Sequence, residues 1–315
     1  MKSFQLIRLN VSSYQSPDFI EREKETLQSL ELRYCRSQDE LDSSPIILLT
    51  NTHTRLSEIR NLLSRTELII HPNSGYDNLS LDYSLIQNIP TIIGHEIRAH
   101  AVADWILSCF FEASIKRPQS DNWDPGRQWE RTLLKNKEVV LFGYGHIGKM
   151  VTASLKALGV IVHVVDPYVE GCIKDYRELP KKDYHALILC CGLNDKNRQM
   201  FNKELFNHLS FHFIFNSARG GLINEEDLKA YLVKNSEARA YLDVFSKEPY
   251  QDEWNSFPQV IKSSHIAGVY TDLDQEIINF EYKVLKDYLH LDADNFTKKY
   301  FLQLLSSKIK EGVII

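Results

Sequence analysis

The sequence predicts an α/β protein with two parallel sheets, and three observations carry this prediction. Strand-like and helix-like segments alternate along most of the chain, a pattern typical of parallel sheets flanked by helices. A length of 315 residues is enough for two domains, each with its own core. A glycine-rich turn lies between a strand and a helix near the middle of the chain. We therefore expect a doubly wound sheet and a second, smaller parallel unit.

The first part of the chain predicts five short strands with helices between them. The strands are expected at Gln5–Leu9, Leu30–Tyr34, Ile46–Thr50, Glu67–Ile70 and Thr91–Ile93. The helices are expected near Pro17–Leu27, Leu56–Leu63 and Leu81–Gln87. This alternation resembles a small flavodoxin-like unit.

A polar segment marks the best candidate for a domain boundary. A helix from Ala99 to about Ala113 leads into it, and it runs from Lys116 to Asn136. Its tryptophans, Trp123 and Trp129, are expected to cover a neighbouring surface.

A dinucleotide site is predicted between residues 138 and 166, where a strand, a G-x-G-x-x-G turn, a helix and a second strand follow in order. The first glycine permits the turn, the second lets N–H groups approach a pyrophosphate, and the third allows close helix packing. Asp166, 18 residues after the last glycine, is placed to accept from ribose hydroxyls, which favours NAD over NADP. The alternative is a Rossmann-like methyltransferase, which also has an acid after its second strand. Such an enzyme would not need the polar side chains that follow the later strands of this unit. The predicted cofactor-binding residues of this segment are Gly143, Gly145, His146, Ile147, Gly148 and Asp166.

Three polar side chains follow the later strands of this second unit. After the strands Val139–Phe142 and Val160–Val165, further strands are expected at Ala186–Cys191, Phe211–Phe215, Ala238–Asp243 and Val260–Lys262. Arg219, Glu248 and His265 come after the last three, at the edge where open parallel sheets bind ligands. A histidine base, a carboxylate that orients it and an arginine that grips a carboxylate suit redox chemistry at a secondary alcohol. Taken singly, each could be an ordinary loop residue, but their common edge favours a site.

The end of the chain predicts a discontinuous domain. Helical sequence resumes at Leu273 and continues to the end with a break around Asp292–Asn295, and part of it is expected to return to the first unit. The predicted domains are a substrate domain of residues 1–98 and 286–315 and an NAD-binding Rossmann domain of residues 99–285.

Composition narrows the function classes. A net charge of −5 argues against non-specific nucleic-acid binding, and neither a membrane span nor a secretory signal is evident. Five cysteines without a CxxC pair favour a reducing cytoplasm over a disulfide framework or a zinc site, and no metal is expected. The adjacent Cys190 and Cys191 are interpreted as small buried hydrophobic residues.

At these residues the chain resembles the D-isomer-specific 2-hydroxyacid dehydrogenase family, over about Asn73–Gly268. Residues 217–225 (SARGGLINE) are similar to its arginine loop, residues 242–249 (LDVFSKEP) to its glutamate segment and residues 265–268 (HIAG) to its histidine segment. Ser264 stands where proline is usual before the histidine, Gly192 stands where a proline commonly follows the third strand, and the tail beyond about Asp292 does not match.

The resemblance implies roles for named residues and a partner. Arg219, Glu248 and His265 would be catalytic. Asp243 would receive the nicotinamide carboxamide, the backbone near Ser217 and Ala218 would position the ring, and the turn at Asn73, Ser74 and Gly75 would hold the substrate carboxylate. A homodimer and a cleft that closes during turnover are also implied.

We predict an NAD-dependent reductase that interconverts a 2-oxo acid and its D-2-hydroxy acid. The alternative is an NAD(H)-sensing, corepressor-like interaction protein with little turnover. Glyoxylate, pyruvate, hydroxypyruvate and larger oxo acids stay open as substrates. Arg98 would either meet a second anionic group, such as phosphate, or be a surface arginine at a helix start. The candidates for the substrate pocket are Asn51, Thr52, His53, Asn73 and Arg98.

Overall fold

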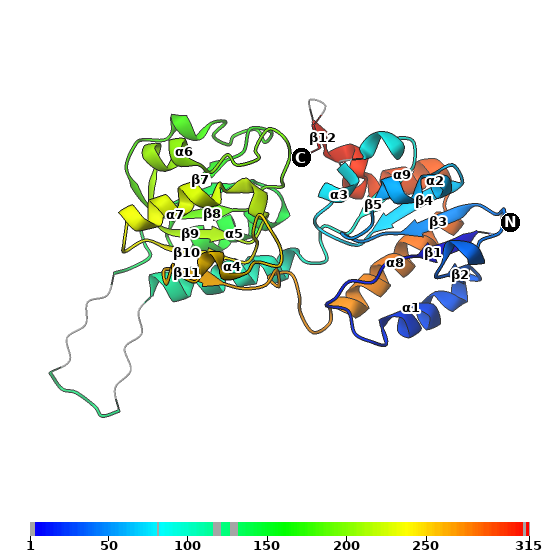
Figure 1. Ribbon diagram of the computed structural model, residues 1–315, viewed down its shortest axis with the longest axis horizontal. Helices are drawn as coiled ribbons and strands as arrows, with labels where there is room; N and C mark the ends of the chain where they lie inside the picture. The colour runs from blue at the N-terminus through cyan, green and yellow to red at the C-terminus, as the bar shows by residue number, and fades with distance from the viewer. Residues whose placement is uncertain (1–3, 81, 116–120, 127–131, 311–312, 315) are drawn as a thin grey trace. The chain divides into compact units, whose positions relative to one another are not determined.

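The chain divides into two compact units, each built on its own parallel sheet (Figure 1). The computed structural model describes residues 4–80, 82–115, 121–126, 132–310 and 313–314. The first unit comprises residues 1–99 and 269–315, and the second comprises residues 100–268. In the part of the chain that is described, no helix is both long and apolar enough to cross a lipid bilayer.

The first unit contains a five-stranded parallel sheet in the order β2-β1-β3-β4-β5, the flavodoxin-like order. Its strands are β1 (Gln5–Arg8), β2 (Arg33–Cys35), β3 (Ile46–Leu49), β4 (Thr66–His71) and β5 (Thr91–Ile93). Its helices are α1 (Phe19–Leu27), α2 (Arg60–Leu63), α3 (Asp77–Ser80), α8 (Leu273–His290) and α9 (Ala293–Tyr300).

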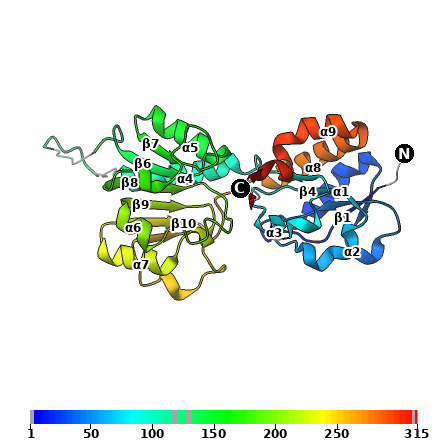
Figure 2. The ribbon, with the colours of Figure 1, turned by 90° about the horizontal axis from the view of Figure 1, so that it is seen from above.

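Helices cover both faces of this sheet because successive strand residues point to opposite sides. In β3, Ile46 and Leu48 pack in the cluster that includes α2, whereas Ile47 and Leu49 pack with α1, α8 and α9. Figure 2 shows α8 and α9 on one side of the sheet and α2 and α3 on the other. Strands buried on both faces read as continuous apolar runs, which is why the sequence identified β3 so clearly.

The second unit contains a six-stranded parallel sheet in the order β11-β10-β9-β8-β6-β7. The chain runs from β6 outward to β7 and then returns to the other side of β6, so the strand order reverses between β6 and β8. Ligands of open α/β sheets bind at such a reversal, beyond the carboxyl ends of the strands. The strands are β6 (Glu138–Phe142), β7 (Ile161–Val165), β8 (Asp183–Leu189), β9 (Ser210–Asn216), β10 (Arg239–Leu242) and β11 (Val260–Lys262).

Helices again cover both faces of the second sheet. Figure 2 shows α4 (Ala99–Ser114) and α5 (His146–Ala157) on one side of this sheet and α6 (Lys203–His208) and α7 (Glu225–Lys234) on the other. The side chains of each helix pair form an apolar layer with the sheet face that they cover. The predicted doubly wound α/β fold is therefore confirmed.

The chain returns to the first unit earlier than predicted. The observed boundary lies between Gly268 and Val269, whereas the prediction placed it between residues 285 and 286. Helix α8 belongs wholly to the first unit because Leu273, Ile277 and Ile278 pack with Phe19 of α1. The amphipathic pattern of α8 showed that it has a buried face, but not which sheet it covers.

Two local predictions in the first unit were wrong. Leu30 ends a short 3₁₀ turn, and the strand predicted at Leu30–Tyr34 begins only at Arg33. Of the helix predicted at Leu81–Gln87, the described residues form only the 3₁₀ turn Tyr83–Leu85, since this segment is held by i→i+3 hydrogen bonds. Leu81 lies outside the described residues.

The polar segment and the chain end also differ from expectation. Trp123 is 80% exposed, so most of its side chain is uncovered, contrary to the expectation, while Trp129 lies outside the described residues. The end of the chain is not helical throughout, because after α9 the chain forms 3₁₀ turns and the antiparallel pair β12 (Ile309–Lys310) and β13 (Val313–Ile314). The predicted break before α9 is present, and Asp292 caps that helix by accepting from the Asn295 N–H at 2.8 Å.

Candidate active site

The carboxyl edge of the second sheet carries the three predicted catalytic side chains. Arg219, Glu248 and His265 lie in the loops that follow β9, β10 and β11, respectively. Parallel connectivity brings these loops to one edge of the sheet, as the sequence analysis expected.

His265 and Glu248 form a hydrogen-bonded pair. The Nδ1 atom of His265 lies 2.7 Å from Oε2 of Glu248, and the other carboxylate oxygen accepts from the Phe245 N–H at 3.0 Å. Burial opposes ionisation of Glu248, but the bonds from His265 and Phe245 and the charges of His265 and Arg219 outweigh it, so the pKa of Glu248 lies below its usual range. A carboxylate only accepts hydrogen bonds, so Nδ1 carries the proton and Nε2 is the imidazole atom that can exchange a proton with a ligand.

Asp243 builds the loop that presents the histidine. Its carboxylate accepts from Ser263 Oγ at 2.6 Å and from the N–H groups of Ile266 and Ala267 at 2.9 Å each. Its main-chain oxygen accepts from the His265 N–H at 2.8 Å. His265 itself adopts a left-handed backbone conformation with φ of 55°, which is uncommon for a residue other than glycine and is stabilised here by these bonds.

Sequence reasoning therefore missed one role of Asp243, a residue only 1% exposed. Asp243 directly follows β10, and His265 lies about twenty residues further along the chain. Nothing in this spacing indicated that Asp243 would hold the His265 loop. Its expected role toward a nicotinamide carboxamide stays a prediction.

The arginine loop is fixed by its neighbours. Asn216, at the end of β9, accepts from the Ala218 N–H at 3.1 Å and donates to the Arg219 carbonyl at 3.0 Å. A Cβ on Gly220 would lie 1.9 Å from the carbonyl carbon of Phe245, so only glycine lets the arginine and glutamate loops approach so closely. The positive charge of Arg219 helps to lower the pKa of Glu248, which links all three groups electrostatically.

The predicted dinucleotide turn has the geometry that its glycines require. Gly143 has a φ of 93°, and a Cβ on Gly148 would lie 2.0 Å from the Gly143 carbonyl oxygen. A Cβ on Gly145 would meet no atom within 4 Å. Gly145 precedes α5, whose first N–H groups have no acceptor within the helix. The turn thus leaves open space beside a helix N-terminus, the arrangement that suits a phosphate.

Two further features fit a bound dinucleotide. Asp166 accepts from the N–H groups of Tyr144 and Tyr168 at 2.8 and 2.9 Å, which joins the end of β7 to the glycine turn. The hydroxyl of Ser217 is buried and has no hydrogen-bond partner among the described residues. The N–H of Ala218 is bound to Asn216, so it is not a free donor.

The first unit carries the predicted substrate turn, residues 73–75. The main-chain N–H groups of Ser74 and Gly75 donate to no described residue, so both can receive an anion. Of the other pocket candidates, Asn51 is buried and bonded within its own loop, whereas Thr52 and His53 are exposed. Arg98 is 8% exposed, so its interpretation as a surface arginine is wrong.

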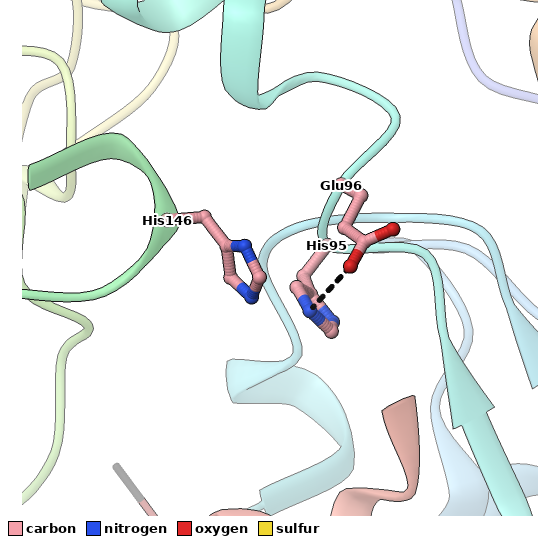
Figure 3. Close-up of side chains that lie close together, drawn as sticks. All are labelled: His95, Glu96 and His146. Atoms are coloured by element: carbon pink, nitrogen blue, oxygen red, sulfur yellow. Dashed lines mark ion pairs between the residues drawn. The ribbon is translucent and has the colours of Figure 1, made fainter. Parts of the chain in front are cut away.

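The loop after β5 contains a histidine that the sequence analysis did not single out. His95 is 8% exposed, and its Nε2 lies 3.9 Å from Oε1 of the exposed Glu96 (Figure 3). Figure 3 also labels His146, the first residue of α5.

Comparison with known proteins identifies the class. Residues 108–267 match the model of the D-isomer specific 2-hydroxyacid dehydrogenase NAD-binding domain, and the chain belongs to this family. The match falls within the second unit, which contains the glycine turn and the three polar loops.

Individual relatives are distant. D-3-phosphoglycerate dehydrogenase of Bacillus subtilis is 22% identical over 299 residues, which cover 87% of this chain and 57% of that protein. Hydroxypyruvate reductase of Thermotoga maritima is 24% identical over 262 residues, or 76% of this chain and 84% of that protein. The structure of D-lactate dehydrogenase from Aquifex aeolicus with NAD and lactic acid superposes with a TM-score of 0.70 at 18% identity, covering 96% of this chain and 99% of that one. The chain spans about half the length of the phosphoglycerate dehydrogenases it matches.

Proposed function

We propose that this protein is an NAD-dependent oxidoreductase that interconverts a small 2-oxo acid and its D-2-hydroxy acid. The observation that carries the proposal is the hydrogen-bonded pair of His265 and Glu248 at the ligand-binding edge of the second sheet, with Arg219 in the neighbouring loop. Membership of the family and the names of the relatives support the same reaction class.

Each residue has a distinct role in this proposal. When bound, NAD(H) supplies or accepts the hydride at its nicotinamide ring. His265 donates a proton from Nε2 to the carbonyl oxygen during reduction and removes it during oxidation. Glu248 accepts from Nδ1 and so holds the ring with Nε2 as the atom that exchanges the proton. Arg219 grips the substrate carboxylate and polarises the adjacent carbonyl.

The substrate-holding and cofactor-holding residues complete the proposal. The N–H groups of Ser74 and Gly75, which donate to no described residue, receive the carboxylate. The turn at Gly143, Gly145 and Gly148 receives the pyrophosphate, and Asp166 receives the ribose. A homodimer is the expected assembly. All five cysteines are unpaired, which supports a reducing compartment such as the cytoplasm.

A screen of NADH oxidation with a panel of 2-oxo acids tests the proposal. The panel should include glyoxylate, pyruvate, hydroxypyruvate, phosphorylated hydroxypyruvate and branched oxo acids, with chiral analysis of each product. We expect turnover with at least one acid and a D-product. Tight NADH binding without oxidation by any member of the panel would instead favour the sensor alternative.

A further inference from the structure

Two carbonyl oxygens of the turn from Pro72 to Gly75 accept hydrogen bonds from side chains, while the N–H groups of Ser74 and Gly75 have no acceptor among the described residues. The Pro72 carbonyl accepts from Arg98 Nη1 at 2.7 Å, and the Gly75 carbonyl lies 2.8 Å from His71 Nε2. The N–H groups of Ser74 and Gly75, which lie between these two fixed carbonyls, donate to no described residue. The turn is therefore anchored at both ends in a way that leaves its donors available.

His71 is an internal anchor with a defined tautomer. It ends β4 and is fully buried. A carbonyl can only accept, so Nε2 must carry the proton that is donated to Gly75. The Nδ1 atom lies 2.8 Å from Thr50 Oγ1, a hydroxyl that can donate to it at the end of β3. Through these two hydrogen bonds the His71 ring connects the ends of β3 and β4 to the turn.

Arg98 anchors the other end. Besides Pro72, its guanidinium contacts Tyr14, both through the phenol oxygen and across the ring at 5.3 Å from the ring centroid. The Tyr14 hydroxyl in turn donates to Asn73 Oδ1 at 3.4 Å. Among the described residues no carboxylate pairs with Arg98, so its fixed hydrogen bonds all serve the turn and its neighbours. A planar, forked donor can hold two such acceptors at once, which an ammonium group does less well.

We propose that His71 and Arg98 are positioning residues that preorganise the Ser74 and Gly75 N–H groups for a substrate carboxylate. The proposal rests on the function proposed above and names the residues that set the carboxylate contact. Neither side chain needs to touch the substrate to act in this way. Because anchored donors need no reordering when an anion binds, loss of an anchor should weaken carboxylate binding and leave cofactor binding intact.

Binding of oxamate, a carboxylate-bearing analogue of a 2-oxo acid, to the protein–NADH complex tests this proposal. We would compare His71→Leu with His71→Gln, whose amide can still donate to Gly75, and Arg98→Met with Arg98→Lys. The Leu and Met variants should bind oxamate about tenfold more weakly or worse, whereas Gln and Lys should recover part of the loss. NADH affinity, followed by fluorescence titration, should not change.

A second substrate separates anchoring from a general loss of structure. For the Leu and Met variants, KM should rise for pyruvate while kcat changes little, and methyl pyruvate, which lacks the carboxylate, should be affected much less. Wild-type oxamate affinity in His71→Leu, or an equal loss of NADH affinity in both variants, would overturn the inference.

The outcomes also separate this inference from the proposed function. If Arg98→Met impaired only phosphorylated oxo acids, direct contact with a second anion would replace anchoring for that residue. A wild-type protein that binds NADH but neither oxamate nor any 2-oxo acid would refute the proposed function itself. Normal oxamate binding by wild type and by all four variants would refute the anchoring alone.

Discussion

Each unit contains a group of charged side chains joined by hydrogen bonds, and the two groups differ in how far they are buried. In the second unit, the His265 and Glu248 side chains are 53% and 36% exposed, and the pair lies at a sheet edge. In the first unit, Arg8, Glu23 and Glu281 join β1, α1 and α8, and their side chains are at most 1% exposed.

The charged groups of the buried cluster are bonded to one another, although Glu281 Oε2 has no hydrogen-bond partner among the described residues. Arg8 Nε lies 2.9 Å from both oxygens of Glu23, and its Nη2 binds Glu281, while the Tyr34 hydroxyl donates to Glu23. Such a group can hold helices against a strand but cannot reach a ligand. In the exposed pair, Nε2 of His265 has no hydrogen-bond partner among the described residues and the side chain reaches solvent, so the pair can exchange protons. Burial, more than residue type, separates the structural cluster from the proposed catalytic one.

The largest expected effect lies at the exposed pair. His265→Ala should lower kcat by about 10²–10⁴-fold, the usual contribution of a general acid–base residue. NADH affinity and thermal stability should stay close to wild type because the side chain is half exposed. Steady-state rates, NADH fluorescence titration and thermal melting measure these three quantities. Near-wild-type turnover on the best substrate would remove His265 from the mechanism.

The buried cluster should respond in the opposite way. Arg8→Met leaves Glu23 charged and unpaired in the interior, which should cost about 3–5 kcal/mol in the free energy of unfolding. Urea unfolding measures this loss. Arg33→Met provides the matched control, since Arg33 forms an exposed pair with Asp42 and should change stability little. Equal effects of the two substitutions would contradict the contrast between buried and exposed pairs.

Two glycines of the dinucleotide turn differ in their surroundings: Gly148 is packed against main-chain atoms, and Gly145 faces open space. Gly148→Ala places a methyl group 2.0 Å from a main-chain oxygen and should destabilise the fold by about 1–3 kcal/mol. Gly145→Ala meets no atom within 4 Å, so the protein should melt as wild type does but bind NADH about tenfold more weakly. Unchanged NADH affinity in folded Gly145→Ala would argue against a pyrophosphate at this turn.

The smallest expected effect concerns Glu281. Its burial raises its pKa well above 4.5; Arg8 opposes this shift and the charge of Glu23 adds to it. The folded protein therefore holds a proton that the unfolded chain releases. This contribution to stability is complete below about pH 4.5 and is lost as the pH rises through the raised pKa. Because glutamine resembles the protonated acid, Glu281→Gln should flatten this decline in unfolding measurements between pH 5 and 8.

Glu23→Gln is the control for that experiment. Burial raises the pKa of Glu23, but the charge of Arg8 and the donated hydrogen bonds outweigh it, so the pKa is lowered and the group is ionised. Loss of its charge should destabilise the protein at neutral pH. If Glu281→Gln were as destabilising as Glu23→Gln, Glu281 would be ionised in the folded protein.

The sequence by itself determined the parallel α/β fold, the glycine turn and the edge of the sheet that carries Arg219, Glu248 and His265. These features follow from local patterns: apolar runs mark buried strands, glycine is required where no Cβ fits, and parallel connectivity sends alternate loops to one edge.

The long-range contacts that hold those features in place were evident only from the tertiary structure. Asp243 holds the histidine loop 20 or more residues along the chain, His71 connects Thr50 to Gly75, and Arg8 meets Glu281 across 273 residues of sequence. It also decided that α8 packs on the first unit. Such contacts depend on which faces meet after folding, and no local periodicity records that choice.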